Sequence, residues 1–245
     1  MKQSSFKLWE DKSPYDGSEI VAIITNLFSP SKNPKTGPMS QLWILPKNEV
    51  PWQAIKTEDG DDGVCGDCIY APKRAKRAKA NGHKIPSCYV ARRGWQAPSS
   101  VWKAYINKPI QLKDGLKAIE QNNMPIRFGA YGDIGMLPSD LVDRIYSVIN
   151  THTAYTHTAY THQYNRVWAS WTKAYAMASV NNKYDGKLFR ELNWRTFRVT
   201  ERPEAGLNEI ICPNYTHGTQ CIDCGLCNGS YGPDDKRKSI TIPAH

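Results

Sequence analysis

The sequence predicts an α/β protein whose parallel strands form a (β/α) barrel, a partial barrel or a doubly wound sheet. Strand and helix patterns alternate at least four times between residues 124 and 212, and such alternation implies parallel strands joined by right-handed crossovers. Polar and titratable residues also follow the predicted strands, at the edge where parallel α/β folds build their sites. These residues are Asp133, His162, Ser179, Thr200 and Cys212.

The first half of the chain contains two predicted strands and three predicted helices. Residues 19–27 are rich in Ile and predict the first strand, and residues 41–45 predict a second strand that Pro46 stops. A proline-rich loop separates the two strands. Helices are predicted over residues 71–80, from a cap at Ser99 or Ser100 to Ile106, and over residues 112–119.

The second half of the chain is more regular. Residues 138–149 place apolar side chains at 141, 142, 145, 148 and 149, which is the spacing of one helix face. Segments rich in β-branched and aromatic residues alternate with such helices. The expected order is strand 124–133, helix 138–149, strand 155–163, helix 165–174, strand 175–180, helix 186–192, and strands 195–199 and 209–212.

Length and composition fit one large domain, because the chain has 245 residues and 40% apolar content. We expect a barrel-like domain over residues 1–211 and a cysteine-rich segment over residues 212–245 that packs on it. The net charge of +9 suits an anionic partner, or simply a well-solvated surface. The N-terminus lacks an apolar signal sequence, and residues 20–24 are too few to span a bilayer. We therefore expect a soluble cytoplasmic protein with no membrane partner.

Four cysteines near the C-terminus give the strongest chemical signal. Cys221, Cys224 and Cys227 recur at intervals of three, and Cys212-Pro213 precedes them. A Cys-x-x-Cys-x-x-Cys run with a remote Cys-Pro is typical of the ligands of an iron–sulfur cluster of the 4Fe–4S type. Zinc is the alternative, although zinc sites usually combine two Cys-x-x-Cys pairs separated by a longer stretch. The spacing therefore favours the cluster.

Cys65, Cys68 and Cys88 form an N-terminal cysteine group. Three thiolates leave one iron of a four-iron cluster without a cysteine, and that iron can bind a small molecule or another ligand. The total of seven cysteines is odd, which excludes complete pairing as disulfides, and allows two centres or one centre that draws on both groups. The alternatives for the N-terminal group are ordinary buried thiols or a reversible disulfide between Cys65 and Cys68.

Two further segments carry candidate site residues. The loop Gly129-Ala-Tyr131-Gly132-Asp133 lets the backbone approach a ligand and ends in a carboxylate. It is a candidate for binding a ribose hydroxyl or an amine of a cofactor, and a tight turn capped by Asp133 is the alternative. His162 lies between hydrogen-bonding side chains and is a candidate catalytic residue together with Asp133, or else a core histidine.

Three arginines, Arg127, Arg195 and Arg198, lie within predicted strands. An arginine inside a parallel sheet has to be paired. We expect one or more of them to point into the interior toward an anion, or else to face solvent at an edge.

A tandem repeat ends at His162. Thr-His-Thr-Ala-Tyr occurs at residues 151–155 and 156–160, and Thr161-His162 begins a third copy. The repeat offers His152, His157 and His162, but its period matches neither a helix nor a strand, so we do not expect all three to bind one metal. We expect His162 at the strand end and the earlier copies in an extended loop or strand.

A basic run from Lys73 to Lys79 lies in a stretch, residues 71–93, that contains no acidic residue. The same stretch also includes Lys84, Arg92 and Arg93. Such a run can follow a nucleic-acid backbone, and Trp95 and Trp102 can stack on bases. The alternative is a solvated helix with the tryptophans in the core.

Several motifs together resemble a family of uncharacterised phage and prophage proteins over roughly residues 60–230. They are Cys65-x-x-Cys68, Cys88-Tyr89-Val90, Trp102-Lys-Ala-Tyr105, Arg127-Phe-Gly-x-Tyr131-Gly-Asp133, Tyr160-Thr-His-Gln163, Met177-Ala-Ser-Val180, Trp194-Arg-Thr-Phe-Arg-Val199, Cys212-Pro213 and the Cys221–Cys227 run. The resemblance implies a phage-encoded protein made in the cytoplasm of a bacterial host. The doubled Thr-His-Thr-Ala-Tyr departs from the single Tyr-Thr-His-Gln of that family.

A barrel-like fold with cysteines at strand ends is also similar to radical S-adenosylmethionine enzymes, at the level of the fold alone. The chain lacks the Cys-x-x-x-Cys-x-x-Cys loop of that superfamily. The similarity implies S-adenosylmethionine as a candidate ligand.

We therefore expect an iron–sulfur protein whose cysteines all reach the C-terminal edge of the strands. Redox or radical chemistry would take place there, with Asp133 and His162 binding substrate. The alternative is a zinc- or cluster-stapled module that binds nucleic acid or a host protein, in which the metal serves folding alone.

Overall fold

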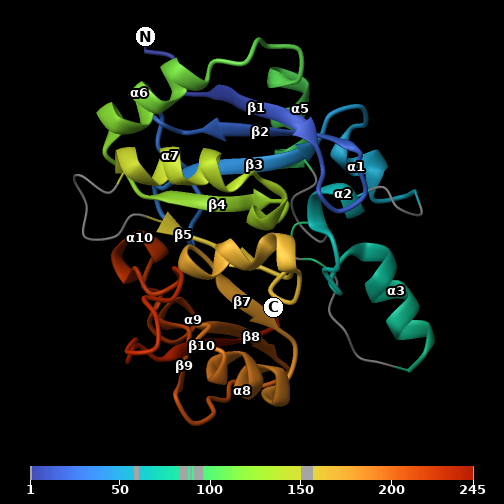
Figure 1. Cartoon of the computed structure of the whole chain (residues 1–245), viewed down its shortest axis with the longest axis vertical. Coiled ribbons are helices and arrows are strands. Elements are labelled where there is room, and N and C mark those ends of the chain that lie inside the picture. Colours follow the sequence, from blue (N-terminus) through green and yellow to red (C-terminus); the bar gives the residue numbers. More distant parts are fainter. Residues whose placement is uncertain are drawn as a thin grey trace.

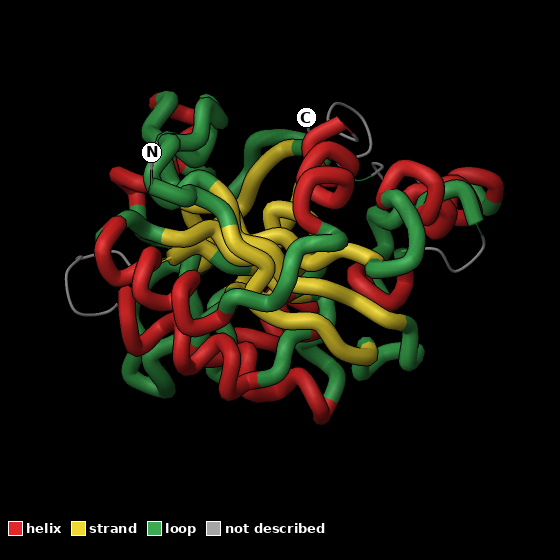
Figure 2. Tube along the Cα trace, turned by 90° about the horizontal axis from the view of Figure 1, so that it is seen from above, coloured by secondary structure: helices red, strands yellow, loops and turns green. Residues whose placement is uncertain are grey.

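The computed structural model describes residues 2–57, 61–82, 88, 90, 96–149 and 157–244. The chain forms two adjoining five-stranded sheets, one mixed and one parallel (Figure 1). Strands occupy the middle of the molecule and helices lie on either side of them (Figure 2). The predicted α/β class is confirmed. The strands in the described ranges lie in two sheets, and no closed barrel is shown.

The first sheet has the order β1 (Phe6–Lys12), β2 (Glu19–Thr25), β3 (Ser40–Pro46), β4 (Ile126–Tyr131) and β5 (His157–Thr158). The pairs β1/β2 and β2/β3 are antiparallel, whereas β3, β4 and β5 are parallel. The parallel pairing expected from the alternation over residues 124–212 is observed, whereas β1 is not among the predicted strands and forms an antiparallel edge with β2. The connection between these two strands is too short for a crossover and permits only a hairpin.

The second sheet has the order β6 (Tyr160–Thr161), β7 (Met177–Val180), β8 (Thr196–Thr200), β10 (Ser239–Pro243) and β9 (Glu209–Ile211). All of its described pairs are parallel. The cysteine-rich segment returns to this sheet, because β10 inserts between β8 and β9. Residues 212–245 thus supply an inner strand as well as cysteines.

Ala159 joins the two sheets. It lies between β5, which pairs with β4, and β6, which pairs with β7. Its carbonyl accepts from the Met177 N–H at 3.1 Å, and its N–H donates to the Cys227 carbonyl at 2.9 Å. One short segment therefore continues the parallel strands from the first sheet into the second.

The longest helices in the described ranges are α6 and α7, with 11 residues each. Helices α6 and α7 pack against each other, and α6 also packs on β1. The predicted helix 165–174 is a 3-10 helix, and the helix predicted at 186–192 begins earlier, at an Asn182 cap. The helices are α1 (Pro51–Ala54), α2 (Asp62–Cys65), α3 (Pro72–Ala80), α5 (Gln96–Tyr105), α6 (Leu112–Asn122), η1 (Ile134–Met136), α7 (Ser139–Ile149), η2 (Val167–Ala174), α8 (Lys183–Glu191), α9 (Pro213–His217) and α10 (Cys221–Cys224).

Within the described ranges, none of the helices is both long enough and apolar enough to cross a bilayer.

Candidate metal centres

Two glycines shape the loop that follows β4. Gly129 and Gly132 have φ values of +68° and +83°, where other residues are strained. A Cβ on Gly132 would lie 2.6 Å from the carbonyl oxygen of Ile44. Beyond this turn, the Asp133 N–H donates to the Val64 carbonyl at 2.7 Å. The loop is therefore held directly against α2, which carries the first cysteine.

Asp133 is 4% exposed, and its carboxylate accepts two backbone hydrogen bonds. Oδ1 accepts from Gly135 N–H at 2.8 Å and Oδ2 accepts from His162 N–H at 2.6 Å. Burial raises the pKa of Asp133 to about 6, although these hydrogen bonds act to lower it. The turn capped by Asp133 is thus observed, and the same carboxylate fixes the backbone of His162.

Cys65, Cys68 and Cys88 gather beside this loop, and we call them the triad. Cys65 ends α2, and the following turn bonds the Cys68 N–H to the Cys65 carbonyl at 3.3 Å. The Cys88 N–H donates to the Tyr70 carbonyl at 2.7 Å. Burial raises the pKa of the Cys65 thiol, and the nearby charges of Asp61, Cys68 and Cys88 raise it further. Cys65 and Cys68 are thiols rather than a disulfide.

His162 and Tyr131 also border the triad. Nε2 of His162 lies 3.7 Å from Sγ of Cys68, and the edge of the ring meets Tyr70. Burial lowers the pKa of His162 to about 4, so the imidazole is neutral at neutral pH. Burial also raises the pKa of Tyr131, and the Cys65 charge raises it further. The predicted position of His162 at a strand end is confirmed, since β6 ends at Thr161.

Sequence reasoning misses two neighbours of the triad. Gln163 donates from Nε2 to the Cys65 carbonyl at 3.1 Å, and its amide fills the space beside Gly66. Asp61 accepts a hydrogen bond from the Cys65 thiol, and burial raises its pKa to about 6. Gln163 belongs to the Tyr-Thr-His-Gln motif, which is a usable signal. Asp61 lies in a Gly- and Asp-rich stretch that predicts only a flexible loop.

Cys212, Cys221, Cys224 and Cys227 form a second group, which we call the quartet. Cys212 follows β9, and α10 begins at Cys221 and ends at Cys224. Burial raises the pKa of Cys221 to about 11, with Cys212 and Cys224 adding to the rise. Cys227 is buried, and the charges of the other three act on its thiol. All four thiols are therefore electrostatic neighbours of one another.

Three cations surround the quartet. Arg127 and Lys35 lower the pKa of Cys221, and Arg195 lowers that of Cys224, in each case against burial. Four thiolates around a divalent metal or a cluster core carry a net negative charge, so nearby cations stabilise the occupied site.

Arg195 also ties the cysteine loop to the sheet. It is 3% exposed, and its Nη1 donates to the Leu226 carbonyl at 2.5 Å and to the Asn228 carbonyl at 3.1 Å. Arg198, three residues further along the chain, pairs with the buried Glu209 at 2.7 Å. The expectation that strand arginines point inward is confirmed for these two.

The triad and the quartet lie at opposite ends of the parallel strands, so the expectation of one shared edge is wrong. The Cys221 N–H donates to the Lys35 carbonyl at 2.9 Å, in the loop that leads into the start of β3. The triad instead contacts residues that follow the ends of β4 and β6. Figure 1 shows α10 and α2 on opposite sides of the strands.

The short length of β9 explains this separation. Its last residue, Ile211, pairs with Thr241, which lies in the middle of β10. Cys212 therefore follows a strand end, as predicted, but only halfway along the sheet. The chain then turns back toward the strand starts.

The donors of both groups suit a thiolate-bound metal centre. Among the described residues, no three His, Cys, Asp or Glu side chains stand close enough together to hold one metal ion. Cysteine thiolates are the ligands of both zinc sites and iron–sulfur clusters, and the triad and the quartet bring together three and four of them.

The two described histidines of the repeat, His157 and His162, have different surroundings. His157 is buried in β5, packs edge-on against Phe128 and Tyr146, and has Nε2 2.6 Å from the Tyr175 carbonyl oxygen. His157 is therefore a core histidine. His152 and the first copy of the repeat lie outside the described residues.

The basic run forms α3, which projects away from both sheets (Figure 1). Lys76, Arg77 and Lys79 are exposed. Arg74 is instead turned inward, where it pairs with Asp62 at 2.7 Å. Trp102 donates to the Pro46 carbonyl at 2.8 Å and packs on the core, so the core alternative is confirmed for this residue. Lys84, Tyr89, Arg92, Arg93 and Trp95 lie outside the described residues.

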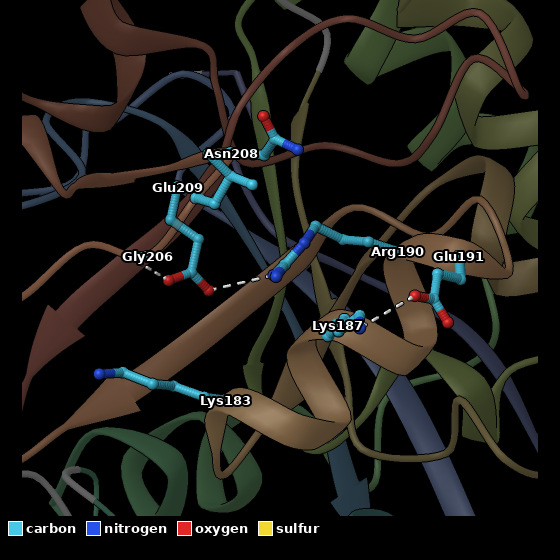
Figure 3. Close-up of a pocket in the computed structure, with 8 residues that line it drawn as sticks. Lys183, Lys187, Arg190, Glu191, Gly206, Asn208 and Glu209 are labelled. Carbon is cyan, nitrogen blue, oxygen red and sulfur yellow. Dashed lines mark hydrogen bonds and ion pairs between the residues drawn. The ribbon is translucent and has the colours of Figure 1, made fainter.

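A hollow of about 420 Å³ lies beside α8 and residues 206–209, and the residues that line it include no cysteine (Figure 3). Its cations are already paired. Lys187 lies 3.8 Å from Glu191, and Arg190 lies 3.1 Å from Glu209. Lys183 pairs with Glu204 at 3.2 Å. The hollow therefore offers little unbalanced charge to an anionic ligand.

Comparison of the chain with models of protein families, with curated proteins and with solved structures finds no match. Functional inference consequently starts from the triad, the quartet and their surroundings.

Proposed function

We propose that this chain is an iron–sulfur protein with two centres of different kinds. The quartet supplies four thiolates, a complete set for a 4Fe–4S cluster. The triad supplies three thiolates and lies beside Asp133 and His162, where β4 and β6 end. Parallel α/β folds build active sites at that edge. The convergence of the triad with these two residues is the observation that carries the proposal.

An iron–sulfur cluster supplies one-electron transfer when bound, and an iron without a cysteine ligand accepts another ligand. S-adenosylmethionine is our candidate for a small-molecule ligand at the triad, by analogy with the radical S-adenosylmethionine fold. The parallel strands from β3 to β8 follow chain order across the joined sheets, which supports a partial barrel. The motif resemblance supports a phage-encoded protein of the bacterial host cytoplasm.

Metal binding at the triad should be coupled to the release of protons. Burial keeps the Cys65 and Cys68 thiols protonated in the absence of metal, so metal binding has to release protons. Asp61 and Asp133, whose pKa values burial raises to about 6, lie close enough to take part in that proton release. Metal loading of the triad is therefore expected to improve as the pH rises above 6.

Matched cysteine variants test for two separate centres. We expect anaerobically reconstituted wild-type protein to be brown and to contain iron and acid-labile sulfide. Cys224→Ala should lose the iron and sulfide held by the quartet, and Cys68→Ala should lose those held by the triad. Ser99→Ala is the control and should keep all of its iron and sulfide, because the Ser99 hydroxyl is buried with no hydrogen-bond partner. Colourless protein with stoichiometric zinc and no sulfide would refute the proposal.

Calorimetry tests the small-molecule ligand. We expect S-adenosylmethionine to release heat on binding to reconstituted wild-type protein and to Cys224→Ala, but not to Cys68→Ala. If the wild type does not bind S-adenosylmethionine, this ligand is refuted, but the proposal of two clusters is not.

A second candidate function is a metal-stapled module that binds nucleic acid or a host protein. The projecting, basic face of α3 favours it. If Lys76 and Lys79 contact phosphates, their joint replacement by alanine should reduce the slope of log affinity against log salt by about 2. Lys113→Ala with Lys117→Ala on α6 is the control. Nucleic-acid binding that is equal in both double variants would dismiss α3 as the contact.

A further inference from the structure

His162 makes contacts through both of its ring nitrogens. Nε2 lies 3.7 Å from Sγ of Cys68, and Nδ1 lies 3.9 Å from Oδ2 of Asp133. One nitrogen thus faces the triad, and the other faces a carboxylate that is almost completely buried.

This arrangement selects the nitrogen that is able to bind a metal. A neutral imidazole carries its proton on one nitrogen and a lone pair on the other. The negative charge of Asp133, 3.9 Å from Nδ1, favours the proton on that nitrogen and leaves the lone pair on Nε2, which lies 3.7 Å from Cys68 Sγ. Histidine ligands in metalloproteins usually have a carboxylate or carbonyl beside the nitrogen that does not bind the metal.

The surroundings hold the ring in this position. The His162 N–H is bound to Asp133 Oδ2 at 2.6 Å, and the Tyr70 ring contacts the imidazole edge-on with centroids 5.7 Å apart. The next residue, Gln163, donates to the Cys65 carbonyl at 3.1 Å. The strand end that carries His162 is therefore fastened to the segment that carries two of the three triad cysteines.

We propose that His162 is the fourth protein ligand of the triad centre, binding iron through Nε2, with Asp133 as the residue that positions the ring. This inference rests on the proposed iron–sulfur function and gives His162 a metal-binding role in place of substrate binding. It makes the triad centre a three-cysteine, one-histidine site, chemically distinct from the all-cysteine quartet. Any small molecule that binds this iron has to displace the imidazole.

Pulsed electron paramagnetic resonance of the reduced, reconstituted full-length protein tests the ligand directly. We expect the strong ¹⁴N coupling of a directly bound imidazole, changed to a ¹⁵N coupling by ¹⁵N-histidine labelling. His162→Cys should keep its iron and sulfide, lose the nitrogen coupling and shift one reduction potential downward, because histidine in place of cysteine raises a cluster's potential. His217→Asn is the control, since His217 is exposed and lies on α9 in the quartet segment.

The wild-type spectrum decides the matter even if His162→Cys fails to fold. Clusters without nitrogen coupling would overturn the inference, and so would coupling that survives in His162→Cys. A protein without iron and sulfide would refute the proposed function, and the inference with it, because His162 would have no iron to bind.

Discussion

Replacement of Glu209 should lower both the stability of the protein and the metal content of the quartet. Its Oε2 accepts from Arg198 Nη2 at 2.7 Å and from the Gly206 N–H at 2.8 Å. Its Oε1 accepts from Arg198 Nε and from Arg190 Nη1, both at 3.1 Å. The side chains of Glu209 and Arg198 are 2% and 3% exposed. This carboxylate fastens β9, and Cys212 follows β9 directly.

Glu209→Gln keeps the shape of the side chain but removes its charge. Breaking a buried ion pair on one side costs about 3–5 kcal/mol. The amide still accepts some of these hydrogen bonds, so we expect a loss of about 3 kcal/mol in the free energy of unfolding. For a chain of this size, that loss lowers Tm by about 6–12 °C. We also expect the quartet to retain less metal, because Cys212 loses its anchored strand.

The pH dependence gives a second readout. Burial acts to raise the pKa of Glu209, but Arg198, the Gly206 N–H and Arg190 outweigh it and lower the pKa below the ordinary value of 4.5. This stabilisation is present above pH 4.5 and is lost as the pH falls through the lower, folded-state pKa. Glu209→Gln should lack that part of the acid dependence.

Urea unfolding at several pH values measures both effects. Glu191→Gln is the control, because Glu191 is 61% exposed and faces Lys187 at 3.8 Å, so its loss should cost less than about 0.5 kcal/mol. If Glu209→Gln unfolds within about 1 kcal/mol of the wild type and keeps its acid profile, the buried pair does not hold β9 as we describe.

Two further predictions concern the loop beside the triad. Gly132→Ala should destabilise the protein by about 1–3 kcal/mol more than Gly82→Ala, since φ is +83° and +81° at the two positions but only Gly132 would place a Cβ against backbone, the Ile44 carbonyl. Thermal unfolding compares them, and equal losses would contradict the close approach. Asp133→Asn replaces one of the two carboxylate oxygens that accept from backbone N–H groups and should cost about 1–3 kcal/mol. Because the Asp133 pKa is raised from 3.8 to about 6, its contribution to stability is present below pH 3.8 and is lost as the pH rises through about 6. Asp133→Asn should lack this loss, and an identical pH profile in the variant would show that Asp133 does not titrate as a buried acid.

The sequence predicts those helices and strands whose buried face shows as a regular spacing of apolar residues. Helix α7 follows from its apolar residues at helical intervals, and β2 follows from five consecutive buried apolar residues. Strand β10 could not be predicted in the same way. It has only five residues, Ser-Ile-Thr-Ile-Pro, and it becomes a strand because β8 and β9 leave a place between them. Such long-range pairing leaves no periodic signal in so short a segment.

In the candidate site too, the sequence predicts local contacts and not long-range ones. Cys-x-x-Cys spacing correctly indicates that Cys65 lies beside Cys68 and Cys221 beside Cys224, because it depends on one turn of backbone. The parallel-strand rule correctly brings Asp133 and His162 to one edge. The relation between the triad and the quartet depends on where β9 stops relative to β10, which no local pattern encodes. Asp61 cannot be singled out from the sequence, because its burial is what distinguishes it from Asp62 beside it.

The content of iron and acid-labile sulfide per chain, measured on anaerobically reconstituted wild-type protein, tests the two-centre proposal most directly. We expect about eight of each if both groups hold four-iron clusters. About four of each, removed completely by Cys224→Ala and left unchanged by Cys68→Ala, would show that the triad holds no cluster. Zinc without sulfide would contradict both centres.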